Sequence, residues 1–240
     1  MRAMILAAGR GERMRPLTDQ TPKPLLSVGG KPLIVWHIEK LAAAGIHDIV
    51  INHAWLGEQF PARLGHGERW GVRLHYSPES SALETAGGIR QALPSLGQAP
   101  FLVVNGDVWT DWNPQAAPAA AEQLRRTASL AWLCLVDNPS HHPGGDFMLN
   151  PAPHVTDDTP ADDAPEHATQ RLTFSGIGLY SPALFADLPP GQPHKLAPLL
   201  RAAMRRNQVI GTHFRGIWED IGTPERLAAL DQRLRASHSV

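Results

Sequence analysis

The sequence predicts an α/β fold in which a mixed, mostly parallel sheet is flanked by helices. Short apolar runs alternate along the chain with segments of helical periodicity, which is the pattern of strands joined by helical crossovers. No internal repeat is present, and no linker separates two cores. A chain of 240 residues with 42% hydrophobic residues can bury one sizeable core, so we expect residues 1–240 to form a single domain.

The apolar segments are expected to form the strands of this sheet. Residues 2–8 and 101–105 are almost wholly apolar, which is typical of strands that are buried on both faces of a parallel sheet. The other strands are expected at 48–52, 72–76, 129–136, 172–180 and 209–214.

Two helices are expected between these strands. Residues 32–44 have helical periodicity, with Pro32 suited to the first helical position and Gly45 suited to the C-terminal cap. Residues 87–93 are expected to form a short helix. A last helix follows Thr223 and Pro224, which suit its N-cap and its first position.

The charge balance argues against nucleic acid and membranes as partners. There are 22 Lys and Arg residues against 23 Asp and Glu residues, so no overall field would attract a polyanion. No signal peptide is recognisable, and no segment approaches the roughly 20 apolar residues that a membrane-spanning helix needs. The single cysteine, Cys134, excludes an intramolecular disulfide. We therefore expect a soluble, cytoplasmic monomer or small homo-oligomer that acts on small molecules.

One segment differs from the rest in composition. Residues 151–170 contain several prolines and acidic side chains but almost no large apolar residue. Such a composition is typical of a mobile insertion or of a functional lid, and we expect a mobile insertion here.

A glycine-rich loop follows the first predicted strand. Gly9 and Gly11 could present backbone N–H groups to phosphate oxygens, because neither carries a Cβ that would block the approach. The loop matches neither the Walker A pattern nor the dinucleotide-binding pattern, and such a turn is often only a tight turn. Lys23 lies between Pro22 and Pro24, whose rings stiffen the segment. A stiff lysine could position a triphosphate; the alternative is a solvated lysine in a surface turn.

Two aspartates could hold a metal ion. Asp107 follows the strand at 101–105, and Asp220 precedes the last helix. Ligands of open α/β sheets bind beyond the carboxyl ends of the strands, which would place Asp107 near the glycine-rich loop if the two strands are neighbours. Mg²⁺ usually takes one or two carboxylates together with substrate phosphates, which Asp107 and Asp220 could supply. Both aspartates could instead be ordinary turn residues.

These segments together resemble the sugar-1-phosphate nucleotidyltransferase family. The motifs that carry the resemblance are Gly9-x-Gly11-x-Arg13, Arg15-Pro16-Leu17-Thr18, Pro22-Lys23-Pro24, Asn105-Gly106-Asp107 and Trp218-x-Asp220-x-Gly222-Thr223. The resemblance implies a Rossmann-like nucleotide-diphospho-sugar transferase fold of the GT-A-like type. The hexapeptide repeats of the β-helix domain that some relatives carry are absent from this sequence.

The resemblance also implies roles for individual residues. Arg13 would contact the departing phosphates and Lys23 the α-phosphate, so that Arg13, Lys23 and Asp107 are the expected catalytic residues. Asp107 and Asp220 would bind Mg²⁺. Glu84 stands where many members have glycine. The expected nucleotide-binding residues are Ala8, Gly9, Gly11, Glu12, Arg13, Lys23, Glu79, Glu84, Thr85 and Gly88.

One branch of the family is the most similar. The run Leu-Glu-Thr-Ala-Gly-Gly at 83–88 looks like that of the N-acetylmuramate-1-phosphate uridylyltransferases of bacterial cell-wall recycling, and so do the segments 104–108, 141–147 and 173–177. This branch implies UTP and N-acetylmuramic acid 1-phosphate as substrates. Its sugar-binding residues would be Asn105, Gly145, Asp146 and Ser175.

The implied reaction is in-line attack by a sugar phosphate oxygen on the α-phosphorus, with release of pyrophosphate. Because the nucleophile is already anionic, a metal ion, a lysine, an arginine and backbone N–H groups suffice without a catalytic base. The alternatives are a glucose-1-phosphate thymidylyltransferase, a mannose-1-phosphate guanylyltransferase and a non-catalytic nucleotide-sugar sensor. The complete set of charged residues disfavours the sensor, and the glycine spacing disfavours a Rossmann dehydrogenase.

Overall fold

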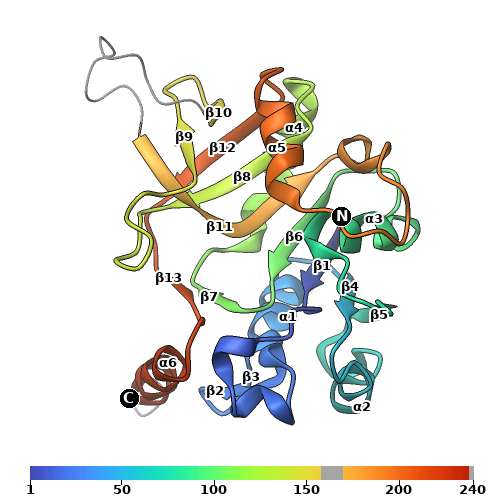
Figure 1. The fold of residues 1–240 in the computed structure, drawn as a ribbon, viewed down its shortest axis with the longest axis vertical. Coiled ribbons are helices and arrows are strands. Elements are labelled where there is room, and N and C mark those ends of the chain that lie inside the picture. Colours follow the sequence, from blue (N-terminus) through green and yellow to red (C-terminus); the bar gives the residue numbers. More distant parts are fainter. Residues whose placement is uncertain (158–169, 238–240) are drawn as a thin grey trace.

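The computed structural model describes residues 1–157 and 170–237, and nine strands of this part form one sheet (Figure 1). Seven of these strands lie side by side in the order β5-β4-β1-β6-β11-β8-β12, and β9 and β10 are added at the first residues of β11. The strands are β1 (Arg2–Leu6), β4 (Asp48–His53), β5 (Arg73–Pro78), β6 (Phe101–Asn105), β8 (Ala131–Val136), β9 (Phe147–Leu149), β10 (Val155–Thr156), β11 (Gln170–Tyr180) and β12 (Val209–Phe214).

The strand directions confirm the predicted mixed, mostly parallel sheet. Neighbouring pairs among β5, β4, β1 and β6 are parallel, and so is the pair of β8 and β12. Only β11 runs against its neighbours β6 and β8 in the seven-stranded part. Most strands therefore end at the same edge of the sheet, which is where ligands bind in folds of this kind.

Helices cover both faces of the sheet because each central strand sends alternate side chains to opposite faces. Ala3 and Ile5 of β1 point to the face covered by α1 (Leu33–Ala43), α2 (Gln59–Leu64) and α4 (Ala117–Arg126). Met4 points to the other face, which is covered by α3 (Glu84–Leu96) and α5 (Leu196–Met204). Both sets of side chains are buried, which explains the continuous apolar runs in the sequence.

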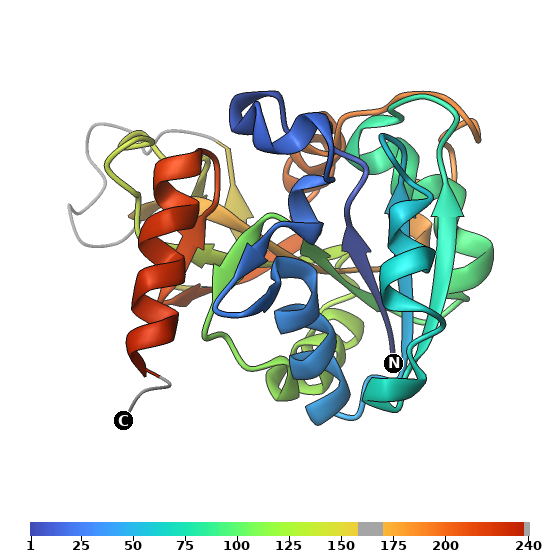
Figure 2. The same cartoon turned by 90° about the horizontal axis from the view of Figure 1, so that it is seen from below.

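A third, smaller core joins the glycine-rich loop to the last helix, α6 (Pro224–Ser237). Met14 comes from this loop, Leu33 from the start of α1, and Leu230 from α6, and all three have no exposed surface. Figure 2 shows α6 standing beside the small ladder of β2 (Ser27–Val28) and β3 (Lys31–Pro32). The C-terminal helix thus fixes the position of the loop that follows β1.

Most of the predicted elements form, with shifted ends. Helix α1 begins after Pro32, and α3 begins at Glu84 and is longer than the expected short helix at 87–93. Thr223 Oγ1 accepts the backbone N–H of Arg226 at 3.4 Å, as expected of an N-cap. Helices α2, α4 and α5 were not predicted. None of the helices in residues 1–157 and 170–237 is long and apolar enough to cross a membrane.

The predicted insertion at 151–170 lies largely outside the described residues, because residues 158–169 are not among them. The part that is described belongs to the sheet. Residues Val155–Thr156 form β10, and Gln170 begins β11.

Replacement of Leu230 by alanine should destabilise the protein by about 2–5 kcal/mol, because it leaves a cavity in the third core. The free energy of unfolding from urea titrations measures this loss. The matched control is Ile217→Ala, since the Ile217 side chain is 47% exposed and its truncation should cost less than about 0.5 kcal/mol. Equal losses in the two variants would contradict the docking role of Leu230.

Candidate active site

The glycine-rich loop is folded tightly over the segment that carries Lys23. Gly11 has a φ of +65°, and a Cβ at this position would lie 3.0 Å from Thr18 Cγ2 and 3.2 Å from Lys23 Cβ. Thr18 Oγ1 donates a hydrogen bond to the Gly11 carbonyl oxygen at 2.8 Å. A Cβ added to Gly9, in contrast, would meet no atom within 4 Å. Gly11 is therefore required by the fold of the loop, whereas Gly9 borders open space.

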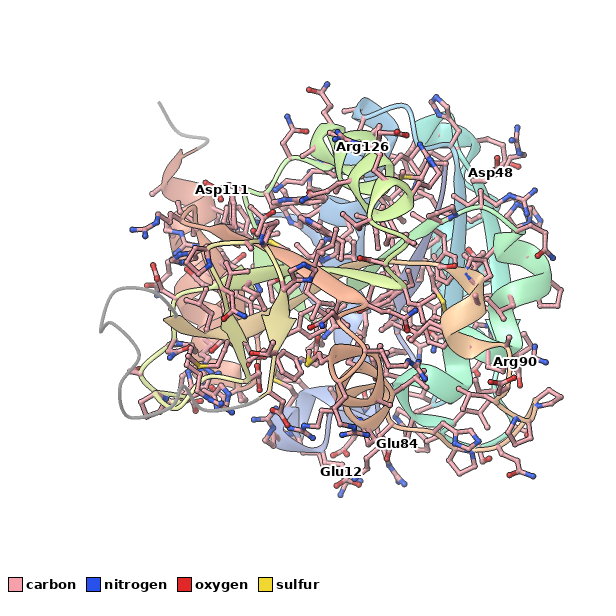
Figure 3. The ribbon with its side chains drawn as sticks, turned by 90° about the horizontal axis from the view of Figure 1, so that it is seen from above. Glu12, Asp48, Glu84, Arg90, Asp111 and Arg126 are labelled. Carbon is pink, nitrogen blue, oxygen red and sulfur yellow. The ribbon has the colours of Figure 1, made fainter. Side chains whose placement is uncertain are left out.

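A cavity of about 530 Å³ opens beneath this loop at the carboxyl ends of the parallel strands. Figure 3 shows Glu12 and Glu84, two of its lining residues, on the same side of the molecule. The cavity brings together most of the residues expected to bind the nucleotide, which come from the segment after β1, the loop after β5 and the start of α3. Those that line it are Ala8, Gly9, Gly11, Glu12, Arg13, Lys23, Glu79, Glu84 and Thr85.

Gly88 does not line this cavity but lies behind it. A Cβ at Gly88 would lie 2.5 Å from Glu79 Oε1 and 2.9 Å from Asn52 Nδ2, so only glycine leaves room for these two side chains. Asn52 donates to Glu79 Oε1 at 2.7 Å and accepts the backbone N–H of Ala7 at 2.9 Å. Glu79 Oε2 also accepts the backbone N–H of Leu83 at 3.0 Å. This buried bridge holds the loops after β1, β4 and β5 together.

Asp107 lies beside Lys23 because β1 and β6 stay in contact up to their ends. The backbone N–H of Gly106 donates to the Leu6 carbonyl oxygen at 2.8 Å, and a Cβ at Gly106 would lie only 2.7 Å from that oxygen. Lys23 Nζ is 2.8 Å from Asp107 Oδ2. The Lys23 side chain is 8% exposed and that of Asp107 is 40% exposed, so the lysine needs this partner for its buried charge.

Asp220 is brought to the cavity wall that also contains Asp107 by an antiparallel ladder between two short strands. These strands are β7 (Val108–Thr110) and β13 (Trp218–Asp220). In this antiparallel ladder Asp220 is opposite Val108, and the Ile221 N–H donates to the Asp107 carbonyl oxygen at 3.0 Å. His37 Nε2 lies 2.8 Å from the Val108 carbonyl oxygen. Burial lowers the pKa of His37 to about 4, so the ring is neutral and donates through Nε2.

The two aspartates fit a hard divalent cation that completes its shell with substrate oxygens. In the part of the chain that the structure describes, no group of three or more His, Cys, Asp or Glu side chains is arranged to hold a metal. Two neighbouring carboxylates are nevertheless the number that Mg²⁺ usually takes when phosphates supply the remaining ligands. The donor set therefore suits a metal that enters with a phosphate-bearing substrate.

A second cavity of about 320 Å³ adjoins the first and shares Asn105 and Asp107 with it. Asp146 lines this second cavity and accepts the backbone N–H of Phe174 at 2.8 Å, and His142 Nε2 lies 3.1 Å from its other oxygen. Asp220 and Trp218 also contribute to its wall. The two cavities thus meet at Asn105, the last residue of β6, and at Asp107, two residues beyond it.

Of the four residues expected to bind the sugar, Asn105, Asp146 and Ser175 line the second cavity, but Gly145 does not. The Ser175 hydroxyl is directed into the strand, because it donates to the Cys134 carbonyl oxygen at 2.7 Å and accepts the N–H of Ile177 at 3.2 Å. Gly145 has a φ of +59° and packs on Asn138, so it shapes the turn.

Comparison with known proteins decides the family. The family model described as nucleotidyl transferase matches residues 2–237. An N-acetylmuramate alpha-1-phosphate uridylyltransferase of Neisseria meningitidis serogroup B is 55% identical over 228 residues, which cover 95% of each chain. A protein of the same name from Caulobacter vibrioides is 34% identical over 239 residues, covering 97% of this chain and 96% of the relative.

The chain belongs to the nucleotidyl transferase family. A solved structure described as a glucose-1-phosphate thymidylyltransferase from Bacillus anthracis superposes on this nucleotidyl transferase with a TM-score of 0.80. The superposition covers 98% of this chain and 95% of the other at 23% identity, which confirms the predicted fold.

Several residues of this nucleotidyl transferase site were missed or misjudged in the sequence. His141 and His142 look like a polar loop pair, yet both line the second cavity. Asn52 could have been found from its place at the end of a parallel strand, where ligand-side residues gather. Arg226 gives no signal in the sequence, because only the folded chain shows that its Nη1 lies 2.8 Å from Asp220 Oδ2.

Cys134 takes no part in the chemistry. The side chain lies inside β8, 1% exposed, and burial raises the pKa of its thiol to about 12. Cys134 is therefore a residue of the hydrophobic core.

The protein should be less stable with glutamate at position 84 than with glycine there, because Glu84 begins α3 with a φ of +57°. We expect Glu84→Gly to be more stable than Glu84→Ala by about 1 kcal/mol, since both variants lose the charge but only alanine keeps a Cβ in the left-handed region. Thermal unfolding of the two variants measures the difference. Equal stability would show that the backbone at Glu84 is not strained.

Proposed function

We propose that this nucleotidyl transferase transfers the uridylyl group of UTP to N-acetylmuramic acid 1-phosphate, giving the UDP-sugar and pyrophosphate. The 55% identity to the Neisseria uridylyltransferase over 95% of both chains supports this substrate pair above the glucose, mannose and sensor alternatives. The reaction would return cell-wall sugar to the nucleotide-activated pool. We place it in the cytoplasm, where UTP is available, and attribute it to one domain formed by residues 1–240.

One observation carries the proposal: two cavities of different size meet at Asp107, with Lys23 at the same point. The larger cavity has the glycine-rich loop and Arg13, which suit a triphosphate. The smaller one has Asn105, Asp146 and Thr173, which suit the hydroxyl groups of a sugar. A phosphate bound at the junction would be accessible from both sides.

The reaction requires two phosphate groups to approach each other. An oxygen of the sugar phosphate forms a bond to the α-phosphorus, the bond from this phosphorus to the bridging oxygen breaks, and the electron pair leaves with pyrophosphate. No proton has to move, because the attacking oxygen is already ionised. The task of the protein is to hold both groups in line and to offset their repulsion.

Lys23 and Arg13 are the residues that we assign to this task. Lys23 is fixed by its buried stem and would exchange Asp107 for an oxygen of the α-phosphate. Arg13 lines the larger cavity and makes no hydrogen bond or ion pair with any other residue of 1–157 and 170–237. It would bind the departing phosphates. Gly9 would allow these phosphates to approach the backbone N–H groups of the loop.

Asp107 and Asp220 are the residues that would hold Mg²⁺. The ion would supply positive charge to the phosphate oxygens and reduce their mutual repulsion. Both carboxylates are held by cations of the protein in this structure, Lys23 on Asp107 and Arg226 on Asp220.

The test of the function is pyrophosphate release with Mg²⁺, using four nucleoside triphosphates crossed with the 1-phosphates of N-acetylmuramic acid, N-acetylglucosamine, glucose and mannose. We expect release with UTP and the muramic acid substrate. Release only with another pair would replace the proposed substrates. No release with any pair would favour the nucleotide-sugar sensor.

Replacement of Lys23 by alanine should lower kcat by about 100-fold or more, because it removes a cation aimed at the charge of the transition state. The initial rate of pyrophosphate release measures this loss. A fair control is Lys31→Met, since Lys31 also forms an ion pair, with Glu39, but lies outside both cavities. A near-normal rate in Lys23→Ala would remove Lys23 from the mechanism.

Replacement of Asp107 by asparagine should raise the Mg²⁺ concentration needed for half-maximal rate by about tenfold or more, because a neutral amide binds the ion more weakly. A magnesium titration at saturating substrates measures the shift. Asp137→Asn is the comparison, as Asp137 pairs with His213 at the surface. An unchanged titration would refute the role of Asp107 as a ligand.

A further inference from the structure

Arg226 is the cation of the site whose role the proposed function leaves open. It lies in the first turn of α6, and its side chain is 31% exposed. Its Nη1 is 2.8 Å from Asp220 Oδ2, 3.4 Å from the Asp220 carbonyl oxygen and 3.3 Å from His141 Nε2. Arg226 therefore reaches from the last helix to the wall of the second cavity, which contains Asp220 and His141.

The space beside Gly222 shows that Arg226 also lies close to the wall of the first cavity. A Cβ at Gly222 would lie 3.1 Å from Arg226 Nη1, 3.4 Å from Arg13 Nη1 and 3.0 Å from Asp220 Oδ2. The two guanidinium groups thus approach the same point from different segments of the chain. Gly222 itself lines the first cavity together with Arg13.

Lys23 and Arg226 are alike in that each forms an ion pair with one of the two aspartates of the site. Each is paired at 2.8 Å with one of the two carboxylates, Lys23 with Asp107 and Arg226 with Asp220. A divalent cation that takes the carboxylate oxygens would compete with both ion pairs. Each cationic group would then be adjacent to anionic phosphate without its former partner.

We infer that Arg226 is a phosphate-binding residue that acts with Arg13 as a guanidinium pair on the departing pyrophosphate. The inference rests on the proposed function, because it requires a triphosphate in the first cavity. Two guanidinium groups can donate to several oxygens of one polyphosphate, which a single arginine cannot do with the same geometry. Asp220 keeps the charge of Arg226 neutralised while no metal and no phosphate are present.

The experiment measures the dissociation constant of pyrophosphate by calorimetry at a magnesium concentration that saturates each protein. We expect Arg226→Met to weaken pyrophosphate binding by about tenfold or more and Arg226→Lys to weaken it less. The control is Arg125→Met, because Arg125 also forms an ion pair on a helix, with Glu122, but lies outside both cavities. It should leave the dissociation constant unchanged.

A magnesium titration by calorimetry at a fixed pyrophosphate concentration separates this role from a purely structural one. If Arg226 only neutralises Asp220, Arg226→Met will change the magnesium affinity and leave the pyrophosphate dissociation constant as it was, which overturns the inference. If Arg226→Met does not fold, Arg226→Lys decides: pyrophosphate binding as in the unsubstituted protein overturns the inference. Failure of the proposed function is distinct, since it appears as absent turnover in the unsubstituted protein.

Discussion

The ion pair of Lys23 and Asp107 is the interaction on which the arrangement of the site depends. A lysine whose side chain is only 8% exposed would be costly without a partner, so the fold must bring a carboxylate to its ammonium group. It does so by keeping β1 and β6 paired to their ends, where Gly106 lets the two backbones approach. The glycine-rich loop, which follows β1, and Asp107, the proposed metal ligand that follows β6, therefore meet at one point.

Close approach of backbones explains why glycine stands at certain positions around this point. The Cβ atoms of other residues would collide with Lys23 at position 11, with the Leu6 carbonyl oxygen at position 106 and with Asn105 at position 176. None of these glycines has to touch a ligand for the site to need it. The motifs that resemble the family signature therefore contain charged residues together with glycines that allow close packing around them. Gly9 differs from Gly11 and Gly106 because a Cβ at position 9 would meet no atom within 4 Å.

The sequence predicted the parallel part of the site better than the rest for a physical reason. Strands at 2–8 and 101–105 are recognisable by apolar runs, and the carboxyl ends of parallel neighbours converge, so Lys23 and Asp107 could be placed together. The family motif proposed Asp220 as a second ligand, but its position depends on pairing between β7 and β13, which leaves no local pattern in such short strands. His141 and Arg226 are partners of Asp220 through contacts distant in the chain, and no spacing rule could find them.

The reversed strand β11 gives the second cavity a different construction from the first. In the parallel part of the sheet the site lies beyond the carboxyl ends of the strands. Strand β11 instead passes between β6 and β8, and its middle residues border the second cavity. The pairing of β11 with β8 has an irregularity between Phe174 and Ile177. This bulge directs the Ser175 carbonyl oxygen to Trp218 Nε1 at 2.8 Å and so anchors the strand that carries Asp220. The irregularity in β11 thus helps to position Asp220, a carboxylate in the wall of the second cavity.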